Sequence, residues 1–325
     1  MITRRNLCVG LPLGLGLAPI SHALGTPKVI GVFNPSFSEE VAPRLELFYQ
    51  AMRDLGYVKG VHFEIVARMA EGRNERLLVL AEELVKLKVD LIFAASTHAV
   101  AAVQESTTTI PIVFIDVADP VRAGFADSLA RPGRNMTGLS NFSADLNPKR
   151  FDLLKQMVPG LSRVVLLVNR NNPYYPSYVQ RMQHAAEQLG LQTMPANVSA
   201  SEDLELAFRA MKEFHAGAFL VTTDAYLWEL RQRIADLALR NRLPSMSGFE
   251  ECAEVGGLLS YGADSKVPMR RAATYVDKIF RGAKPSDLPI EQPTKVDLVI
   301  NRKTASALQL TIPPVLLLQA ERVIE

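Results

Sequence analysis

Two short apolar runs in the sequence each end in side chains that could bind a small polar molecule. Ser96 and Thr97 follow the first run, and Thr223 and Asp224 follow the second. A short, fully apolar run predicts a buried parallel strand, and a helical pattern follows each polar pair. The polar side chains are therefore expected at the carboxyl ends of strands and at helix N-termini, where open α/β sheets bind ligands.

These side chains are suited to charged groups on a ligand. Ser96 and Thr97, together with the N–H groups of the helix that they begin, could hold a carboxylate. Asp224, or Asp116 at the end of another predicted strand, could pair with an ammonium group. Plain helix capping is the alternative for the two hydroxyls, and a turn or cap role is the alternative for the two carboxylates.

The ends of other predicted strands supply further candidates for ligand contact. The polar candidates are Asn34, Ser36, Asn169 and Asn172. Asn34 and Asn172 each precede a proline, so a turn-forming role is the alternative for both. Aromatic side chains could stack on an aromatic or apolar ligand, although such residues also pack in cores. The aromatic candidates are Tyr174, Tyr175, Phe249 and Tyr261.

Alternating strands and helices must position these residues. A strand-then-helix pattern runs from Lys28 to about Ser140 and begins again at Pro148. Such alternation predicts βαβ units and a mostly parallel sheet in each half. Two ligand-binding edges, one in each half, indicate two lobes that face each other across a cleft. Periodicity does not place residues 257–325.

Composition bounds the class of protein. The chain has 325 residues, enough for two domains, with 48% hydrophobic and 22% charged residues, as in an ordinary globular protein. The formal net charge is +2, and it is zero once Arg4 and Arg5 of the N-terminal leader are removed. The neutral remainder gives no electrostatic reason to bind nucleic acid.

The N-terminus carries the pattern of a secretory signal. Arg4 and Arg5 precede an apolar stretch rich in Gly and Leu, and small residues flank His22 at a cleavage point. We expect residues 1–23 to be a signal peptide, exported by the general secretory or the twin-arginine route. Cys8 lies in this leader, so Cys252 would remain alone, without a disulfide, as a small buried residue.

Neither metal nor catalytic chemistry has a signature here. The Cys and His spacings of a metal site are absent, as are the nucleophile elbow and the dinucleotide-binding glycine motif. His98, beside the predicted site, is the best candidate for an alternative interpretation as a secreted α/β enzyme. We expect no catalytic residue, no metal and no cofactor.

Several phrases in the chain resemble one known family. They are Leu55-Gly-Tyr-Val-Lys-Gly, Ala70-Glu-Gly-Arg-Asn-Glu-Arg-Leu, Ile110-Pro-Ile-Val-Phe, Asp119-Pro-Val-Arg-Ala-Gly, Ser128-Leu-Ala-Arg-Pro-Gly-Arg-Asn-Met-Thr-Gly-Leu-Ser-Asn, Gly257-Leu-Leu-Ser-Tyr-Gly, Ala273-Thr-Tyr-Val-Asp-Lys-Ile, Gly282-Ala-Lys-Pro and Leu288-Pro-Ile-Glu-Gln-Pro-Thr-Lys. Together, and in this order, they resemble the ABC transporter substrate-binding family that includes the tryptophan- and tyrosine-binding periplasmic proteins. The family's motif also makes Tyr261 part of a strand-end loop.

The resemblance implies a type I periplasmic binding protein, or Venus-flytrap, fold. This is an α/β architecture of two doubly wound parallel-sheet lobes with an interlobe cleft, joined by three crossovers. By this analogy residues 27–141 and 257–285 form lobe one, and residues 142–256 and 286–325 form lobe two. Ligand would bind between the lobes and drive hinge closure.

The resemblance also implies a function. The chain is expected to be a periplasmic solute-binding protein of an ABC importer. It would bind a small polar or amino-acid-like ligand, with an aromatic one open, and deliver it to a permease in the inner membrane. We expect a monomer without a nucleic acid partner. A sensor that passes its closed state to a membrane receptor is the alternative, because the same fold serves both roles.

Overall fold

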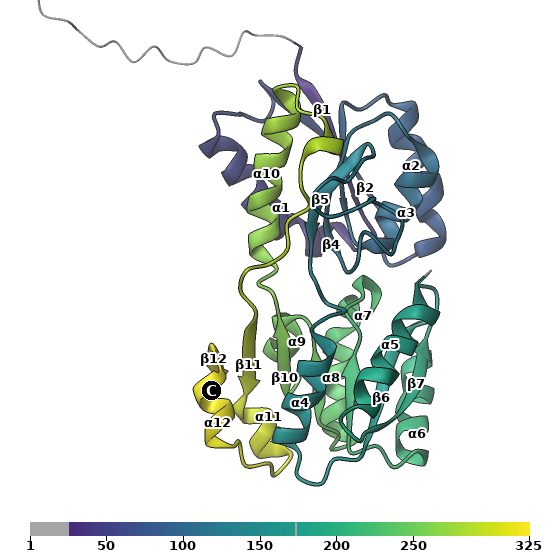
Figure 1. The fold of residues 1–325 in the computed structure, drawn as a ribbon, viewed down its shortest axis with the longest axis vertical. Coiled ribbons are helices and arrows are strands. Elements are labelled where there is room, and N and C mark those ends of the chain that lie inside the picture. The colour runs from purple at the N-terminus through teal and green to yellow at the C-terminus, as the bar shows by residue number, and fades with distance from the viewer. Residues whose placement is uncertain (1–25, 173) are drawn as a thin grey trace, which may run out of the picture.

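The computed structural model describes residues 26–172 and 174–325, and the leader 1–23 lies outside them. Two lobes lie one above the other along the long axis of the molecule (Figure 1). Each lobe is built on its own sheet, one of five strands and one of seven. The predicted fold class of two α/β lobes is therefore confirmed.

The five strands of the first lobe are all parallel. Their spatial order is β2 (Phe63–Met69), β1 (Lys28–Asn34), β3 (Leu91–Ala95), β4 (Ile112–Val117) and β5 (Met136–Ser140). Both faces of the sheet are covered, which is why the central strands are apolar throughout. On β3, Phe93 belongs to the core on one face and Ile92 to the core on the other.

Helices from distant parts of the chain cover these two faces. The helices of lobe one are α1 (Ser38–Asp54), α2 (Leu77–Lys86), preceded by the 3-10 turn η1 (Asn74–Arg76), α3 (Thr97–Ser106) and α10 (Lys266–Phe280). Helices α2 and α3 pack on one face, and α1 and α10 pack on the other. Pairs such as Phe48 with Phe93, whose ring centroids are 5.0 Å apart, hold α1 to the sheet.

The second lobe has a mixed sheet. Its spatial order is β12 (Arg322–Ile324), β11 (Asp297–Asn301), β10 (Leu259–Gly262), β9 (Ser245–Ser247), β8 (Ala218–Val221), β6 (Arg163–Asn169) and β7 (Gln192–Val198). Only the β10–β11 pair is antiparallel, because β11 enters from the other lobe. The rest are parallel.

The helices of this lobe also divide between two cores. They are α4 (Asn147–Met157), α5 (Tyr175–Glu187), α6 (Asp203–Glu213), α7 (Ala225–Glu229), α8 (Arg231–Arg240), α9 (Glu250–Glu254), α11 (Arg302–Ala307) and α12 (Pro314–Gln319). Residues of α4, α5, α11 and α12 share one core, and residues of α6, α7 and α8 share the other. The sequence predicted one helix over 226–240 and did not predict α9.

Three crossing segments join the lobes, at residues 141–146, 263–265 and 292–296. The third follows the 3-10 turn η2 (Pro285–Asp287) and a backbone bridge between Leu139 and Glu291, which keeps residues up to 291 beside β5. The expected boundaries differ at two points. Strand β10 was expected in lobe one but pairs with β9 in the second sheet, and residues 286–291 were expected in lobe two.

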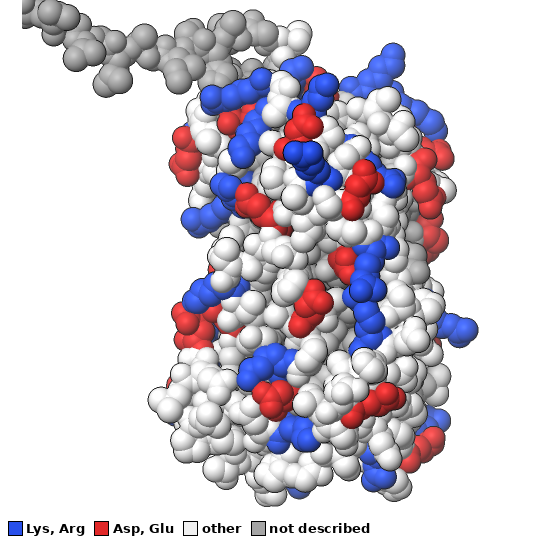
Figure 2. Space-filling view, viewed as in Figure 1, with Lys and Arg blue, Asp and Glu red and all other residues white. Residues whose placement is uncertain are grey.

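The surface and the helices agree with a neutral globular chain. On the face shown in Figure 2, Lys and Arg side chains alternate with Asp and Glu over both lobes, without a large field of either sign. In the described part of the chain, no helix is long and apolar enough to cross a bilayer.

Candidate functional site

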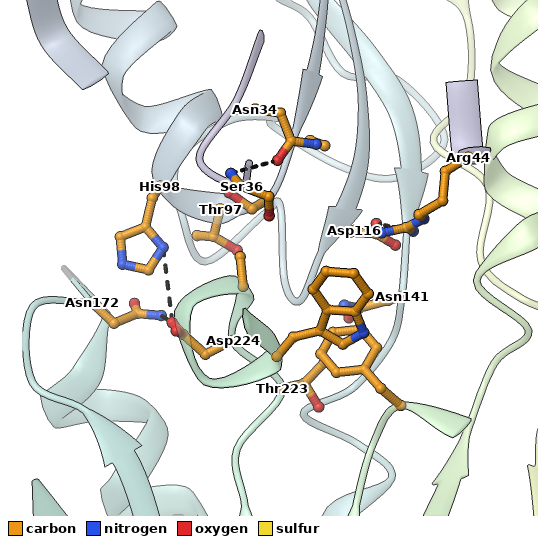
Figure 3. Close-up of a pocket in the computed structure, with 15 residues that line it drawn as sticks. Asn34, Ser36, Arg44, Thr97, His98, Asp116, Asn141, Asn172, Thr223 and Asp224 are labelled. Atoms are coloured by element: carbon orange, nitrogen blue, oxygen red, sulfur yellow. Dashed lines mark hydrogen bonds and ion pairs between the residues drawn. The ribbon is translucent and has the colours of Figure 1, made fainter. Parts of the chain in front are cut away.

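A cavity lies where the carboxyl ends of strands from both sheets face each other (Figure 3). Its empty volume is about 510 Å³, counting the part open to solvent. Polar side chains from β1, β4 and α3 enter it from the first lobe, and side chains around α7 enter it from the second. These polar groups come from residues at or just after the ends of the apolar strands.

The junction of β3 and α3 presents hydroxyls and a helix N-terminus to the cavity. Ser96 caps α3, accepting a hydrogen bond from the Ala99 N–H at 3.4 Å. The backbone of Ser96 has φ 87° and ψ 155°, a region that is nearly exclusive to glycine. Thr97 is the first residue of α3 and lines the same cavity. A ligand anion here would meet backbone N–H groups and the positive end of a ten-residue helix.

The end of β1 adds a second polar loop beside this helix. Asn34 and Ser36 are both buried, and the Asn34 Oδ1 accepts a hydrogen bond from the Ser36 N–H at 2.9 Å. This Asn-Pro turn is therefore formed, as the alternative interpretation held, and its side chains still line the cavity. The two roles coexist.

Asp116 at the end of β4 is paired with a cation that the sequence did not single out. The Arg44 Nη2 on α1 donates to the Asp116 Oδ2 at 3.0 Å. Burial raises the pKa of Asp116 above its ordinary value, although Arg44 opposes this shift, and nearby Glu251 adds to it. Like Ser96, Asp116 has a positive φ, of 59°. Since Arg44 already neutralises this carboxylate, Asp116 is the weaker of the two candidates for an ammonium.

Asp224 is the buried carboxylate of the second lobe. Its Oδ1 accepts from the Asn169 Nδ2 at 3.0 Å and from two N–H groups at the start of α7. Its Oδ2 accepts from the Asn172 Nδ2 at 3.1 Å, and the His98 Nδ1 lies 3.9 Å away across the cleft. All of these donors are neutral groups. They occupy Oδ1 fully and leave capacity on Oδ2.

An aromatic wall completes the cavity. Trp228 lies one turn after Asp224, and its ring lies against two guanidinium groups, 3.9 Å from that of Arg231 and 5.8 Å from that of Arg44. Phe249, at the start of α9, lines the same space. Trp228 was not predicted as a contact residue. Its position four residues after Asp224 could have indicated it, since residues four apart on a helix share a face.

Eight of the ten predicted contact residues line this cavity. They are Asn34, Ser36, Ser96, Thr97, Asp116, Asn172, Thr223 and Asp224. Asn169 is buried behind Asp224 and positions it. Tyr261 does not line the cavity, because it packs against the core below, where its carbonyl accepts a hydrogen bond from Arg150. The cavity is also lined by Arg44, His98, Asn141 and Trp228, which were not predicted contacts, and by Phe249, one of the aromatic candidates.

Two buried polar atoms at the cavity have no partner among the described residues. They are the Nε of Arg44 and the Nε2 of His98. Buried polar atoms of native proteins are nearly always hydrogen-bonded, so these two are exceptions among the buried polar atoms of the site. Within the described residues, no group of three or more His, Cys, Asp or Glu side chains could hold a metal.

The fold and this cleft define a bilobal solute-binding protein, and comparison with known sequences gives the family. The profile of the ABC transporter substrate-binding protein family matches residues 43–324. The chain therefore belongs to that family, and it is a substrate-binding protein of an ABC transporter rather than an enzyme. Membership of this family contradicts the alternative interpretation, in which the chain is an enzyme and His98 is a catalytic residue.

Three relatives illustrate the family. The chain is 25% identical over 264 residues to the tyrosine-binding protein of Clostridioides difficile strain R20291, covering 81% of this chain and 75% of that protein. It superimposes on a Streptococcus pneumonia ABC domain in complex with L-Trp with a TM-score of 0.83, at 24% identity over 92% and 100% of the chains. It superimposes on the ligand-free, open structure of a Clostridium difficile substrate-binding protein with a TM-score of 0.66, at 23% identity over 91% and 99%.

Proposed function

We propose that this protein binds an amino-acid-like ligand with an aromatic or apolar side chain between its lobes and delivers it to a permease. One observation carries the proposal. One cavity, with an empty volume of about 510 Å³ including the part open to solvent, brings together the N-terminus of α3 with two hydroxyls, a buried carboxylate and an aromatic wall. These are the groups that a carboxylate, an ammonium and an apolar side chain require.

The carboxylate end of the ligand is assigned to lobe one. Ser96 and Thr97 stand at the N-terminus of α3, and both line the cavity. The strained backbone of Ser96 supports this role, since strain of this kind persists where surrounding structure and function require it.

The ammonium end is assigned to Asp224 rather than Asp116. Asp224 is 5% exposed, and the side-chain amides and backbone N–H groups that donate to it carry no charge. Asp116 shares its charge with Arg44. A buried charge without a counter-ion is costly, which gives Asp224 a strong preference for a cationic partner.

The apolar part of the ligand is assigned to Trp228 and Phe249. Stacking on an indole or phenyl ring contributes roughly 0.5–1.5 kcal/mol beyond area burial. The relatives named for tyrosine and for L-Trp support an aromatic ligand for this chain as well.

Hinge closure is part of the proposal. The lobes contact each other across the open edge, where the Tyr174 hydroxyl donates to the Ala123 carbonyl at 3.1 Å and the Arg181 Nη1 to the Asp119 Oδ2 at 3.3 Å. The greater similarity to the L-Trp complex than to the ligand-free open structure supports a closed arrangement here.

Export and partners complete the proposal. The N-terminal pattern in residues 1–23 fits a signal peptide, so the working protein is placed in the periplasm as a monomer that docks on an inner-membrane permease. A sensor role would use the same cleft and the same closure.

A thermal-shift screen of the protein without residues 1–23 tests the proposal. The protein is first denatured and refolded to remove carried-over ligand, then melted with amino acids, nucleobases, sugars and small carboxylates. A ligand at 100 times its Kd stabilises by about 2.7 kcal/mol, so aromatic amino acids should raise the melting temperature by several degrees. A shift with sugars or nucleobases alone would overturn the assignment.

A further inference from the structure

A second cavity adjoins the cleft on the hinge side. It lies between the three crossing segments, with an empty volume of about 1060 Å³ including the part open to solvent. It shares Asp116, Asn141, Thr223 and Phe249 with the cleft, so the two spaces meet at one wall. The proposed amino-acid ligand uses only the first.

Arg150 lies at the inner wall of this hinge cavity. Its side chain comes from α4 and is 1% exposed. The Nε donates to the Tyr261 carbonyl at 2.9 Å. The Nη1 donates to the Ser143 carbonyl at 3.0 Å and hydroxyl at 2.9 Å, and to the Asn147 Oδ1 at 2.9 Å. Arg150 therefore ties together the ends of two crossing segments.

All four of these acceptor atoms are neutral. Within the described residues, Arg150 makes no ion pair with a carboxylate, although arginines this deeply buried are rarely without one. Burial lowers the pKa of Arg150 below its ordinary value, and only Tyr178 and Tyr261 oppose the shift. Another guanidinium of the same cavity differs, since Arg271 holds Glu291 through two nitrogens, at 2.8 and 2.6 Å.

The Nη2 of Arg150 lies beside the cavity wall. It takes part in none of the four hydrogen bonds. It lies against Gly248, where an added Cβ would stand 2.6 Å from Nη2, and Gly248 and Thr223 both line the cavity. The Nη2 group of a buried cation thus lies beside two wall residues of a space that solvent can enter.

We propose that the hinge cavity is a second binding site, for a small organic carboxylate whose oxygens accept hydrogen bonds from the Nη2 of Arg150. A carboxylate accepts hydrogen bonds from Nη2 and supplies the missing negative charge. Leu139, Val267 and Pro268 on the cavity wall offer an apolar surface to the body of such a ligand. Because Arg150 joins two crossing segments, occupancy of this site stabilises one hinge geometry.

Ligand-observed NMR with benzoate as the probe tests this site. Benzamide is the matched control, since it has the same ring and shape without the charge. Saturation transfer and a titration are recorded for the wild-type protein and for four variants. The variants are Arg150→Lys, Val267→Trp, Arg271→Lys and Asp224→Asn.

Each variant has a separate purpose. Arg150→Lys removes the Nη2 donor. Val267→Trp places a large side chain in the cavity. Because Val267 is 58% exposed, the substitution leaves the fold intact. This variant therefore tests the site even if Arg150→Lys does not fold. Arg271→Lys alters a guanidinium that is already paired. Asp224→Asn alters the cleft and reports on any benzoate bound there instead.

The proposal expects benzoate to bind the wild-type protein and benzamide to bind at least about tenfold more weakly, as for a charge-assisted contact. Arg150→Lys and Val267→Trp should each weaken benzoate about tenfold or more, while Arg271→Lys and Asp224→Asn should not. Absence of benzoate binding, equal binding of benzamide, or loss in Asp224→Asn with retention in Val267→Trp would each overturn it. These results do not test the proposal that the cleft binds an amino acid, since they concern only the hinge cavity.

Discussion

At the scale of single residues, the cleft is explained by how each charge is compensated. Asp224 has neutral donors and Asp116 has Arg44, so two carboxylates at equivalent strand ends differ in what they can offer a ligand. The sequence predicted both as equals, because a polar residue after an apolar strand is visible in the pattern. Arg44 approaches from a helix 72 residues away in sequence, which no local pattern reveals.

Asp224→Asn should weaken ligand binding about 10- to 100-fold, since a charge-assisted contact of about 1.5–3 kcal/mol is lost. Asparagine is a good N-cap, so α7 should stay formed and the fold intact. Asp203→Asn is the matched control, because Asp203 caps an exposed turn at α6 outside the cleft. Calorimetric titration with the ligand found in the screen measures both. Equal affinity in the two variants would remove Asp224 from the site.

Cys252 should be inert to thiol reagents in the folded protein. It is 8% exposed, as predicted from the sequence, and burial raises its pKa to about 12, although a hydrogen bond with Ser247 acts in the opposite direction. The native state thus holds the thiol proton more tightly than the unfolded chain. This contribution to stability is full below the ordinary thiol pKa and is lost as the pH rises toward about 12.

The rate of modification by a disulfide reagent measures this, using protein without residues 1–23 and hence without Cys8. The rate should equal the unfolding-limited rate and should rise sharply in denaturant. Fast modification at neutral pH with native circular dichroism would contradict the burial of this thiol.

At the scale of elements, the site depends on the junctions between strands and helices. The strand ends were predictable because fully apolar runs stop abruptly at polar residues, as at Ala95 and Val221. Short helices were less predictable from the sequence. Helix α9 has five residues, too few for a periodic pattern, and the single predicted helix over 226–240 is interrupted at Leu230. Phe249, at the start of α9, could therefore not be placed beside Trp228.

Ser96→Gly should raise stability and lower affinity together. A residue held in this backbone region costs roughly 1–3 kcal/mol, and glycine adopts it without strain at an entropic cost of about 1 kcal/mol. The net gain should be about 1 kcal/mol, while the hydroxyl proposed to bind the ligand is gone. Ser265→Gly, at the start of α10 with an ordinary φ of −67°, should instead destabilise.

Chemical denaturation and calorimetry on these two variants give both quantities. If Ser96→Gly were less stable than the wild type, the backbone at this junction would not be strained. If its affinity were unchanged, the Ser96 hydroxyl would have no part in binding.

At the scale of the whole molecule, the order of the sheets decides which segments meet. The alternation of strands and helices predicted two lobes, and the resemblance supplied three crossings. The assignment of β10 to the first lobe failed because Leu258 and Leu259 are apolar residues that either core would accept. Pairing with β9 and with β11 fixes the strand in the second sheet, and the pairing with β11 joins residues that are distant in sequence.

Tyr174→Phe should loosen the closed state without touching the cavity. The variant loses one hydrogen bond between the lobes, from the Tyr174 hydroxyl to the Ala123 carbonyl, and keeps the ring contact with Phe125. A net hydrogen bond of about 0.5–1.5 kcal/mol corresponds to a 2- to 10-fold faster ligand release. Stopped-flow measurement of dissociation checks this, with Tyr49→Phe on the outer face of α1 as the control. Identical release from both variants would show that this contact does not hold the lobes closed.

The central claim is that the cleft recognises both charged ends of an aromatic amino acid. Calorimetric titration of the refolded protein with L-tyrosine and L-tryptophan, and with their amine and carboxylic acid analogues, tests it most directly. Tyramine and tryptamine lack the carboxylate, and the matching aryl propanoates lack the ammonium. The account predicts that at least one of the two amino acids binds, and that each of its analogues binds at least about tenfold more weakly, as the loss of one charged contact requires. An analogue that binds as tightly as its parent amino acid would contradict the assignment of that end, and no binding of either amino acid would contradict the aromatic ligand itself.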